Sequence, residues 1–502
     1  MKGFLVFVAV VVAVGTALLA QSEGGNWWEE GNEPERSITT RSQPPSRGGV
    51  KAFPTAEGFG ASTPGGRGGY ICEVTNLNDS GKGSFRACAE ASGPRIVVFR
   101  TGGIITTKDN ITVEEPFLTV AGQTAPGGGI TLRATTRYTD GTMAIKTHDV
   151  VIRHMRFRPG PSTSLSPMRR GISLEGSVYN IVLDHVSVSW ATDENVTLID
   201  GVRDVTIQWS IISEGLLDST HTDGPHSMGM LISYKQFGST TTTQDISLHH
   251  NLFAHNNDRN PRNSSSGLVD AVNNIVYNYG IRGVNVSDSG GVIVPQNLSA
   301  NYFKAGPSTE DFAYGVQVSE EGAGASLYID GNLEQDRSGD IQAELYMVHP
   351  DDRQFVVTTR HPAPAVTTTS ASQAYDEVLA GAGTRVPVLD AVDRRMIDDV
   401  KNGSGRIIDD PSEVGGWPRL APGTPPPDAD HDGMPDDWET SHGLDPNDPS
   451  DGPAVSDNGY THVENYLNGL AGDFQLATRL LLRGVTSLSQ GSERPLGRGP
   501  RD

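Results

Sequence analysis

"DVTIQWSII", residues 204–212, is one of four similar nine-residue stretches in this chain. The other three are DVVIRHMRF, which begins at Asp149, NIVLDHVSV, which begins at Asn180, and DISLHHNLF, which begins at Asp245. Each begins with Asp or Asn, continues as a short alternating strand, and passes through a turn residue into a second short apolar strand. The starts are unevenly spaced, so one strand signature recurs with connecting loops of different length. An irregular repeat of this kind indicates a solenoid.

A right-handed parallel β-helix, an all-β solenoid, is the architecture that we predict for this repeat. Each coil would bury its inward-facing Val, Ile and Leu side chains against the neighbouring coils, while Asn and Ser side chains stack and hydrogen-bond at the turns. The 59 glycines and the lack of long amphipathic patterns disfavour a helical domain. Residues 117–134 and 273–280 look like flanking coils. An antiparallel sandwich with coincidental strand similarity is the alternative.

The first 20 residues are typical of a secretory signal peptide. Lys2 precedes an apolar run from Phe4 to about Ala20, with small residues near its end. An uncleaved membrane anchor is the alternative. No later stretch is apolar enough to cross a bilayer, so we expect a secreted protein without membrane association, in the extracellular, periplasmic or cell-surface space. Residues 21–50 are polar and aperiodic, which predicts a disordered leader.

The net charge indicates which partners the protein can bind, and the cysteines indicate the compartment in which it folds. The formal net charge of −22 argues against nucleic acid as a partner, and an acidic substrate would need a local cluster of cations. Cys72 and Cys88 are the only cysteines, and outside the cell they are expected to form a disulfide; two free buried thiols are the alternative. We expect a monomer, because the long sides of a β-helix are already paired.

The composition changes beyond the repeat region. We assign residues 51–360 to the β-helix domain, 361–427 to a mixed helical and linker segment, 428–470 to a calcium-binding segment and 471–502 to a tail. Short helices are predicted over residues 374–383, 388–403 and 461–472, and the first two are closed by glycine.

DADHDGMPDDWE, residues 428–439, matches the twelve-residue calcium loop. Carboxylates stand at positions 1, 3, 5, 9 and 12 with glycine at position 6, and position 7 would offer its backbone carbonyl. The predicted ligands are Asp428, Asp430, Asp432, Met434, Asp436 and Glu439. A solvated acidic linker is the alternative. The predicted role of the calcium ion (Ca²⁺) is structural, because nothing nucleophilic accompanies it.

A second group of chemically competent residues is spread over the repeat. Its members are Asp184, Asp193, Glu194, Asp223, His226, Arg259 and Arg262. Each could be an ordinary turn residue on its own. On successive coils they would together line one face of the solenoid, where a site can form.

Three of these stretches carry a family resemblance. Residues 184–196 (DHVSVSWATDENV), 248–262 (LHHNLFAHNNDRNPR) and 53–69 (FPTAEGFGASTPGGRGG) resemble the pectate lyases of polysaccharide lyase family 1, and most of all secreted members with an acidic calcium loop near the C-terminus. The resemblance covers roughly residues 50–470. It implies a pectin lyase-like β-helix that cleaves α-1,4-galacturonan by β-elimination, with calcium as cofactor, polygalacturonate or pectin as substrate and 4,5-unsaturated oligogalacturonides as products.

The resemblance also assigns a role to Arg259. The family uses an arginine at this position to take the C5 proton, although an arginine pKa above about 12 makes it an unusual base. A second role needs no neutral arginine: a clamp on the carboxylate that also stabilises the enolate-like charge. Arg262 would support the site, and Pro261 would restrict the backbone between them.

Several positions depart from the family pattern. Arg170 stands where members carry an aspartate of the active-site calcium set, and Thr197 replaces a second carboxylate, which leaves Asp193 as the ligand that we carry over. Met228 replaces a substrate-binding lysine, for which Lys235 is a candidate substitute, and Ser264 replaces a further arginine. Pectin lyases of the same fold place an arginine where pectate lyases hold calcium, so Arg170 could do so here.

Three other functions therefore stay open: a non-catalytic pectin-binding β-helix, a pectin lyase acting on methylated substrate, and a galacturonan hydrolase with paired carboxylates.

Overall fold

The structure is a computed structural model. It describes residues 49–137, 140–233, 243–287, 293–319 and 324–474. The predicted signal peptide, almost all of the leader, Lys235 and the tail beyond residue 474 lie outside the described residues. The chain divides into two compact units, residues 1–44 and 45–502, and the fold described below belongs to the second.

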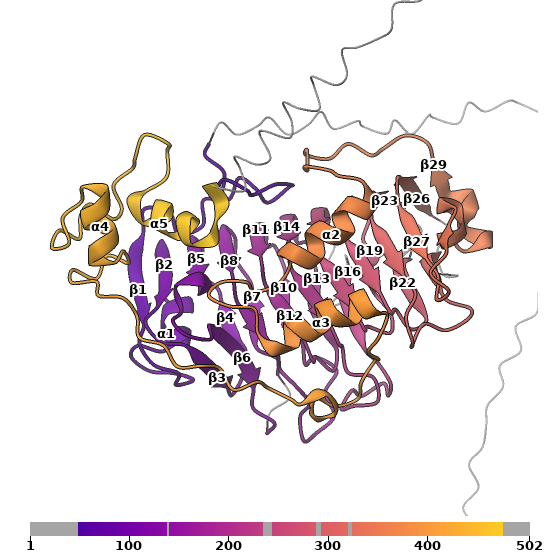
Figure 1. Cartoon of the computed structure of the whole chain (residues 1–502), viewed down its shortest axis with the longest axis horizontal. Coiled ribbons are helices and arrows are strands. Elements are labelled where there is room, and N and C mark those ends of the chain that lie inside the picture. The colour runs from indigo at the N-terminus through magenta and orange to yellow at the C-terminus, as the bar shows by residue number, and fades with distance from the viewer. Residues whose placement is uncertain (1–48, 138–139, 234–242, 288–292, 320–323, 475–502) are drawn as a thin grey trace, which may run out of the picture. The chain divides into compact units, whose positions relative to one another are not determined.

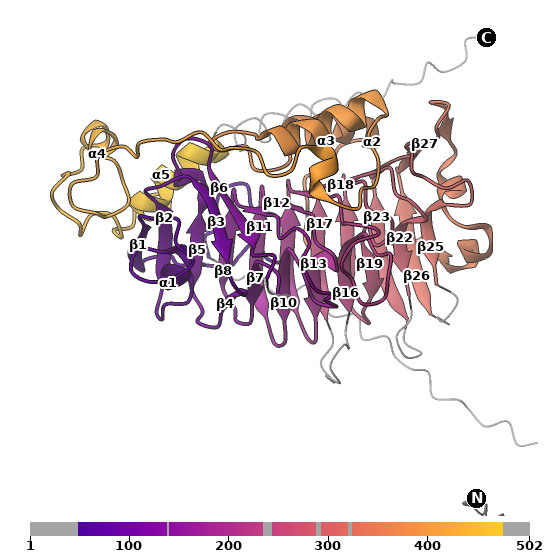
Figure 2. The ribbon, with the colours of Figure 1, turned by 90° about the horizontal axis from the view of Figure 1, so that it is seen from below.

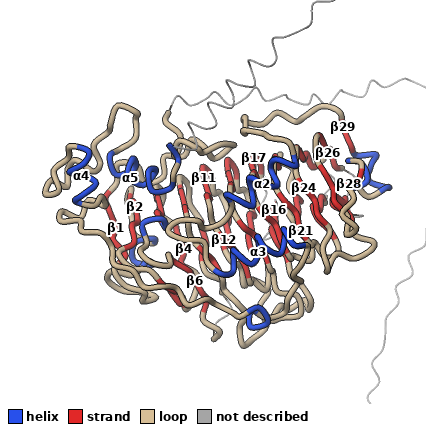
Figure 3. Tube along the Cα trace, viewed as in Figure 1, coloured by secondary structure: helices blue, strands red, loops and turns tan. Residues whose placement is uncertain are grey.

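Three long sheets form the body of this unit (Figures 1 and 3). The first sheet contains β1 (Tyr70–Val74), β2 (Arg95–Phe99), β5 (Leu118–Ala121), β8 (Val150–Arg153), β11 (Tyr179–Asp184), β14 (Arg203–Gln208), β17 (Gln244–His249), β20 (Val269–Val272), β23 (Val294–Ser299), β26 (Ala325–Asp330) and β29 (Val356–Val357). The second contains β4 (Ile111–Val113), β7 (Met143–Ile145), β10 (Ile172–Glu175), β13 (Glu194–Ile199), β16 (Met228–Ser233), β19 (Arg262–Ser264), β22 (Arg282–Val286) and β25 (Tyr314–Val318). The third contains β3 (Gly103–Thr107), β6 (Ile130–Ala134), β9 (Arg156–Phe157), β12 (Ser187–Ser189), β15 (Ile211–Ser213), β18 (Leu252–Ala254), β21 (Ile275–Tyr277), β24 (Tyr302–Lys304), β27 (Leu333–Gln335) and β28 (Ile341–Gln342).

The pairing within these sheets settles the fold. Along the chain, strands of the first, third and second sheets follow one another, and each pairs in parallel with its counterpart one coil away, as in β11 with β8 and β14. Only β27 and β28 pair antiparallel among the named strands of the described residues. The protein is a right-handed parallel β-helix, as predicted, and the antiparallel sandwich is excluded.

The corners of the coils explain why the repeats begin with Asp or Asn. Asp149, Asn180, Asp204 and Asp245 all have left-handed backbone conformations, with φ between 55° and 60°. Asn and Asp adopt this conformation more readily than most other side chains. Five residues later a second left-handed residue turns the chain from the first sheet into the third, as Trp209 does in the repeat at 204–212 (φ 50°).

The interior is held by apolar side chains and by an asparagine ladder. The four ladder residues are Asn251, Asn274, Asn301 and Asn332. Each of the first three donates its backbone N–H to the side-chain oxygen of the next, at 2.9–3.0 Å. The predicted stacking of Asn side chains at the turns is confirmed, and it satisfies buried backbone groups that the sheets do not reach.

A disulfide closes the first coil. Cys72 of β1 is bonded to Cys88 of α1 (Phe85–Ala89), which confirms the predicted pairing. Crosslinking residues separated by 16 positions stabilises a fold by about 3 kcal/mol in the chain-entropy model.

Replacing both cysteines with serine should therefore lower the free energy of unfolding by about 2–4 kcal/mol, because the unfolded chain regains the freedom of the closed loop. Urea denaturation of the oxidised wild type and the double variant measures the difference. Reduced wild type should match the variant, and equal stability of all three samples would contradict the expectation.

Helices from the C-terminal part of the chain cover two of the sheets (Figure 2). The α-helices are α2 (Ala371–Gly381), α3 (Ala391–Asn402), α4 (Asp436–His442) and α5 (His462–Ala471), and the short 3-10 helices are Gly122–Thr124, Glu344–Met347, Pro350–Phe355 and Pro411–Val414. The helices α2 and α3 pack their apolar faces on β15, β18 and β21 of the third sheet. The helix α5 packs on β2 and β5 of the first sheet.

The three predicted helices at 374–383, 388–403 and 461–472 thus correspond to α2, α3 and α5. Among the described residues, no helix is both long and apolar enough to span a membrane.

Candidate active site

The register of the second sheet brings the candidate residues to one end of three successive coils. Glu194, the first residue of β13, lies opposite Met228, the first residue of β16. Met228 in turn forms a parallel bridge with Asp258, just before Arg259. The stretches around residues 193, 226 and 259 therefore meet side by side, although up to 66 positions separate them in the chain.

Arg259 is held from both sides in this group. Its backbone is left-handed (φ 62°), and its N–H donates to its neighbour's carboxylate, Asp258 Oδ1, at 2.6 Å. Its guanidinium Nη1 forms an ion pair with Glu194 Oε1. The Arg259 side chain is 17% exposed, while Glu194 beneath it is 2% exposed. The guanidinium is thus the solvent-facing member of the pair, and its Nε has no hydrogen-bond partner among the described residues.

Arg170 connects the neighbouring carboxylates. Its Nε donates to Asp193 Oδ2 at 2.8 Å and lies 3.6 Å from Glu194 Oε2. Burial alone would lower the pKa of Arg170, but Asp193 and Glu194 outweigh that effect and raise it. Arg170 is therefore a fixed positive charge at the centre of the group.

The two carboxylates respond to this environment in opposite directions. Burial, followed by the charge of Asp193, raises the pKa of Glu194 to about 7. Burial acts on Asp193 as well, but the nearby His226 imidazole and the charge of Arg170 hold its pKa well below the usual range. Asp193 is thus ionised at neutral pH, while Glu194 changes charge there.

Two stacked histidines complete the group. His226 Nε2 lies 3.4 Å from Asp193 Oδ1 and His221 Nε2 lies 3.8 Å from it, and the two rings are parallel within 15° at 3.8 Å. Burial, then the charge of His226, lowers the pKa of His221. The sequence pointed to His226, but nothing in it indicated that the loop folds back to stack His221 on it.

The residues at this position do not fit a calcium ion. Calcium requires six to eight oxygen ligands. One oxygen of Asp193 is taken by the Arg170 guanidinium, and Thr197, at the second carboxylate position, donates its hydroxyl to Glu194 Oε2 at 3.2 Å. The Arg170 guanidinium stands where the family pattern has a ligand.

The remaining predicted residues are placed as follows. Arg262 is the first residue of β19. Its Nε donates a hydrogen bond to Ser287 Oγ at 3.0 Å, and Ser287 belongs to the next coil after that of Arg259. Ser264 is buried and reaches the carbonyl of Ile232 at 3.4 Å, so it does not extend the group. Asp223 is exposed on the loop that carries the two histidines.

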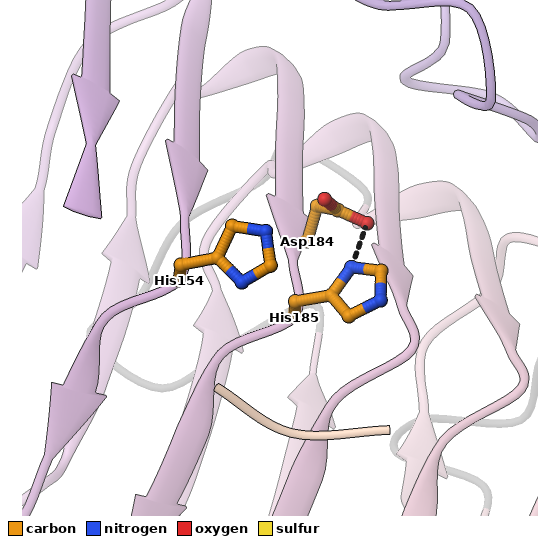
Figure 4. Close-up of side chains that lie close together, drawn as sticks. All are labelled: His154, Asp184 and His185. Carbon is orange, nitrogen blue, oxygen red and sulfur yellow. Dashed lines mark hydrogen bonds and ion pairs between the residues drawn. The ribbon is translucent and has the colours of Figure 1, made fainter. Parts of the chain in front are cut away.

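Asp184 is not part of this group, contrary to the expectation that it lines the same face. It ends β11 of the first sheet and lies close to His154 and His185 (Figure 4). Its Oδ2 accepts a hydrogen bond from Arg153 at 2.8 Å, and its Oδ1 accepts one from Gln208 at 2.8 Å. Both carboxylate oxygens are engaged, so Asp184 is a structural residue of the corner between the first and third sheets.

The C-terminal loop has the donor set that calcium prefers. The carboxylate oxygens of Asp428, Asp430 and Asp432 lie within 4.8 Å of one another. Glu439 at position 12 is completely buried, and neither of its carboxylate oxygens has a hydrogen-bond partner among the described residues. Gly433 turns the loop with φ 90°, as the predicted pattern requires. The oxygens here fit a hard divalent cation.

The chain was compared with known proteins. It is 37% identical over 425 residues to a probable pectate lyase C of Aspergillus terreus, covering 84% of this chain and 94% of the relative. A probable pectate lyase C of Neosartorya fischeri is 36% identical over 425 residues, covering 84% of this chain and 93% of the relative. No protein-family model matches the chain.

Solved structures were compared as well. The cedar pollen allergen jun a 1 is 16% identical with a TM-score of 0.48, covering 65% of this chain and 92% of that one. A pectate lyase from Bacillus sp. N165 in complex with trigalacturonate is 16% identical with a TM-score of 0.44, covering 66% and 99%. The sequence identity to the fungal relatives, over nearly their whole length, shows that this chain belongs to the pectate lyase family.

Proposed function

We propose that this protein is a polysaccharide lyase that cleaves α-1,4-linked galacturonan by β-elimination. The observation that carries the proposal is Arg259, which the second sheet presents at the surface of a charged cluster, in a chain of the pectate lyase family. The products would be 4,5-unsaturated oligogalacturonides.

In this reaction the C5 proton, alpha to the uronate carboxylate, moves to a base. The electron pair of the C5–H bond forms the C4=C5 double bond, the C4–O bond breaks, and the departing oxygen takes up a proton. We assign the C5 proton to Arg259. Its guanidinium also balances the charge that develops on the carboxylate as the proton leaves.

Glu194 explains how an arginine can act as a base here. Its carboxylate contacts the Arg259 guanidinium and can hold the proton that Arg259 must release before it takes the C5 proton. Burial raises the pKa of Glu194 to about 7, which makes its carboxylate a better proton acceptor than an ordinary glutamate. Glu194 is then a positioning residue and a proton acceptor for Arg259.

The activity should rise with pH through about 7, because Glu194 must be ionised to pair with Arg259 and to take its proton. Glu194→Gln should remove this limb of the kcat profile and lower the plateau about 10²-fold or more. The stability of the fold should depend on the ionisation of Glu194 in the opposite direction: activity rises with pH, whereas stability falls. The folded pKa lies above that of an exposed glutamate, so the unfolded chain loses this proton first and stability falls between about pH 4.5 and 7. A variant profile with an unchanged limb would contradict the assignment.

We further propose that Arg170 takes the place of an active-site calcium ion. It already neutralises Asp193, and it carries the positive charge that a cation would bring to the cluster. Arg262, His226 and Lys235 are proposed to bind the substrate around it. Because no calcium ion is needed to bridge to a free carboxylate, a methylated polymer is a second candidate substrate.

The test is the ultraviolet absorbance of the unsaturated uronide after mixing the protein with polygalacturonate or with methylated pectin, each with calcium and with chelator. A rising signal on polygalacturonate that persists in chelator, in samples shown to be folded, supports the proposal. A signal on methylated pectin alone would assign a pectin lyase. Cleavage without the absorbance would indicate a hydrolase, and binding without cleavage a non-catalytic protein.

Three further properties belong to the proposal. Residues 1–20 are removed during secretion, the mature enzyme acts outside the cell as a monomer, and the loop at 428–439 binds one calcium ion with a structural role. The cluster of carboxylates in that loop, with the orphaned oxygens of Glu439, supports the last of these.

A further inference from the structure

The loop at 428–439 does not contain all the carboxylates that surround its centre. We propose that the calcium ion of this loop is also bound by Asp451, from the following loop, and that Asp436 is not a direct ligand, so that the ion fastens α5 to the first coils of the solenoid. This inference rests on the proposed calcium loop and deepens it.

Asp451 lies beside the ligands of the loop at 428–439. Its carboxylate forms a group with those of Asp432 and Glu439, with the potential ligand oxygens within 4.8 Å of one another. Asp451 Oδ1 is a buried atom without a hydrogen-bond partner among the described residues, while Oδ2 accepts from the backbone N–H of Asp445 at 3.1 Å. One oxygen thus fixes the side chain, and the other points to the same centre as the loop ligands.

Glu439 is a buried carboxylate that lacks a counter-charge. Its side chain is 0% exposed, yet neither Oε1 nor Oε2 has a hydrogen-bond partner within the described part of the chain. A buried carboxylate without partners is strongly unfavourable, because its charge is removed from water and nothing compensates it. A cation between Glu439, Asp432 and Asp451 satisfies all three.

Asp436 is engaged by the backbone of its own loop. It is the predicted ligand at position 9, but it is also the first residue of α4, and its Oδ1 accepts from the Ala429 N–H at 2.7 Å. It belongs to no group of potential ligands among the described residues. Position 9 of a twelve-residue loop often reaches its ion only through water, so a second loop can supply the missing direct ligand.

The backbone beside Asp451 is shaped to this centre. A Cβ at Gly452 would lie 2.4 Å from Asp432 Oδ2, so only glycine lets the second loop approach that carboxylate so closely. The carbonyl of Gly452 accepts from Val463 N–H at 3.1 Å, in the first turn of α5. An ion held by Asp451 therefore acts one residue away from the attachment of α5.

The same assembly touches the solenoid from several sides. Val463 and Leu467 of α5 pack with Ile96 and Val98 of β2. Glu464 pairs with Arg67 at 2.8 Å. At the other end of the calcium loop, Asp428 lies 3.3 Å from Arg100, which follows β2. The cation would thus join both loops and the first sheet into one unit.

The experiment is a calcium titration of the full mature protein by calorimetry, with terbium luminescence excited through Trp438, next to Glu439, as a second readout. The variants are Asp451→Asn and Asp436→Asn, with the exposed Asp457→Asn as the matched control. We expect Asp451→Asn to weaken calcium binding at least about tenfold, the affinity that about 1.4 kcal/mol represents. Asp436→Asn and Asp457→Asn should change it less than about threefold.

Hydrogen exchange of residues 462–471 is a second readout, which distinguishes loss of calcium binding from a general loss of stability in Asp451→Asn. Calcium should slow exchange of α5 in the wild type and in Asp436→Asn, but not in Asp451→Asn. Equal calcium affinity of Asp451→Asn and the wild type, or a loss confined to Asp436→Asn, would overturn this inference alone. A wild type that binds no calcium would overturn the calcium loop with it. Neither result touches the lyase proposal, which the uronide absorbance tests separately.

Discussion

Arg259→Ala should lose at least about 10³-fold in kcat on polygalacturonate while its fold is preserved. Positioned proton transfer contributes about 10²–10⁴-fold to a rate, and stabilisation of a developing oxyanion contributes about 10²–10³-fold per donor. Arg259 is proposed to do both, and the ion pair with Glu194 supports this because it orients the guanidinium and offers a place for its proton. The initial rate of uronide absorbance, at saturating substrate, measures the loss.

Arg259→Lys separates the two roles. A lysine keeps the positive charge but loses the planar fork that can face a carboxylate and Glu194 at once. If Arg259 only supplied charge, the lysine variant would recover most of the activity; we expect it to remain within about tenfold of the alanine variant. Arg337, an exposed arginine paired with Asp311, provides the control, and Arg337→Ala should retain wild-type activity. An alanine variant at position 259 that keeps a tenth of the wild-type rate would contradict the assignment.

Removing the calcium ion proposed for the loop at 428–439 should produce the largest change in stability. A ligand present at about 10³ times its dissociation constant stabilises the folded state by about 4 kcal/mol, and chelation removes that contribution. The chelated protein also keeps the carboxylates of both loops close together without a counter-charge. Thermal unfolding followed by circular dichroism, with calcium and with chelator, measures the difference.

Glu439→Gln should change the stability of the protein in opposite directions with calcium and with chelator. In calcium the variant should be less stable than the wild type, because a ligand is lost. In chelator it should be at least as stable, because one buried like charge is gone. The exposed Glu310→Gln should follow the wild type under both conditions. A chelated Glu439→Gln protein that is clearly less stable than the chelated wild type would show that the glutamate has a structural role without calcium.

The sequence predicted the fold because the decisive residues act locally. Asp149, Asn180, Asp204 and Asp245 mark the corners through their own backbone conformation, and the strands after them alternate in a way that short-range patterns reveal. The disulfide and the helices over residues 371–381, 391–402 and 462–471 also depend on local signals, such as cysteine count and closing glycines.

The sequence predicts which residues belong to the charged cluster but not which of them are in contact. Arg259, Asp193 and His226 were found from their motifs, whereas the pairing of Arg259 with Glu194 depends on the register between coils, which the lengths of the intervening loops determine. For Asp184 the sequence predicted a place on the face of the site that the structure does not give it. It lies nine positions before Asp193, and strand periodicity does not say which of three sheets a strand will join. Asp451 was missed because its loop resembles any acidic turn until it is folded against residue 432.

The packing of α5 on β2 has a consequence for how this protein is made. The ribosome completes the first coils several hundred residues before it synthesises α5, yet Ile96 and Val98 of β2 share one buried apolar cluster with Val463 and Leu467 of α5. A nascent solenoid therefore lacks this part of its apolar packing at its leading end through most of translation, and incompletely covered apolar surface favours association with other chains. Helix α5, which is synthesised late, completes the packing at the start of the fold.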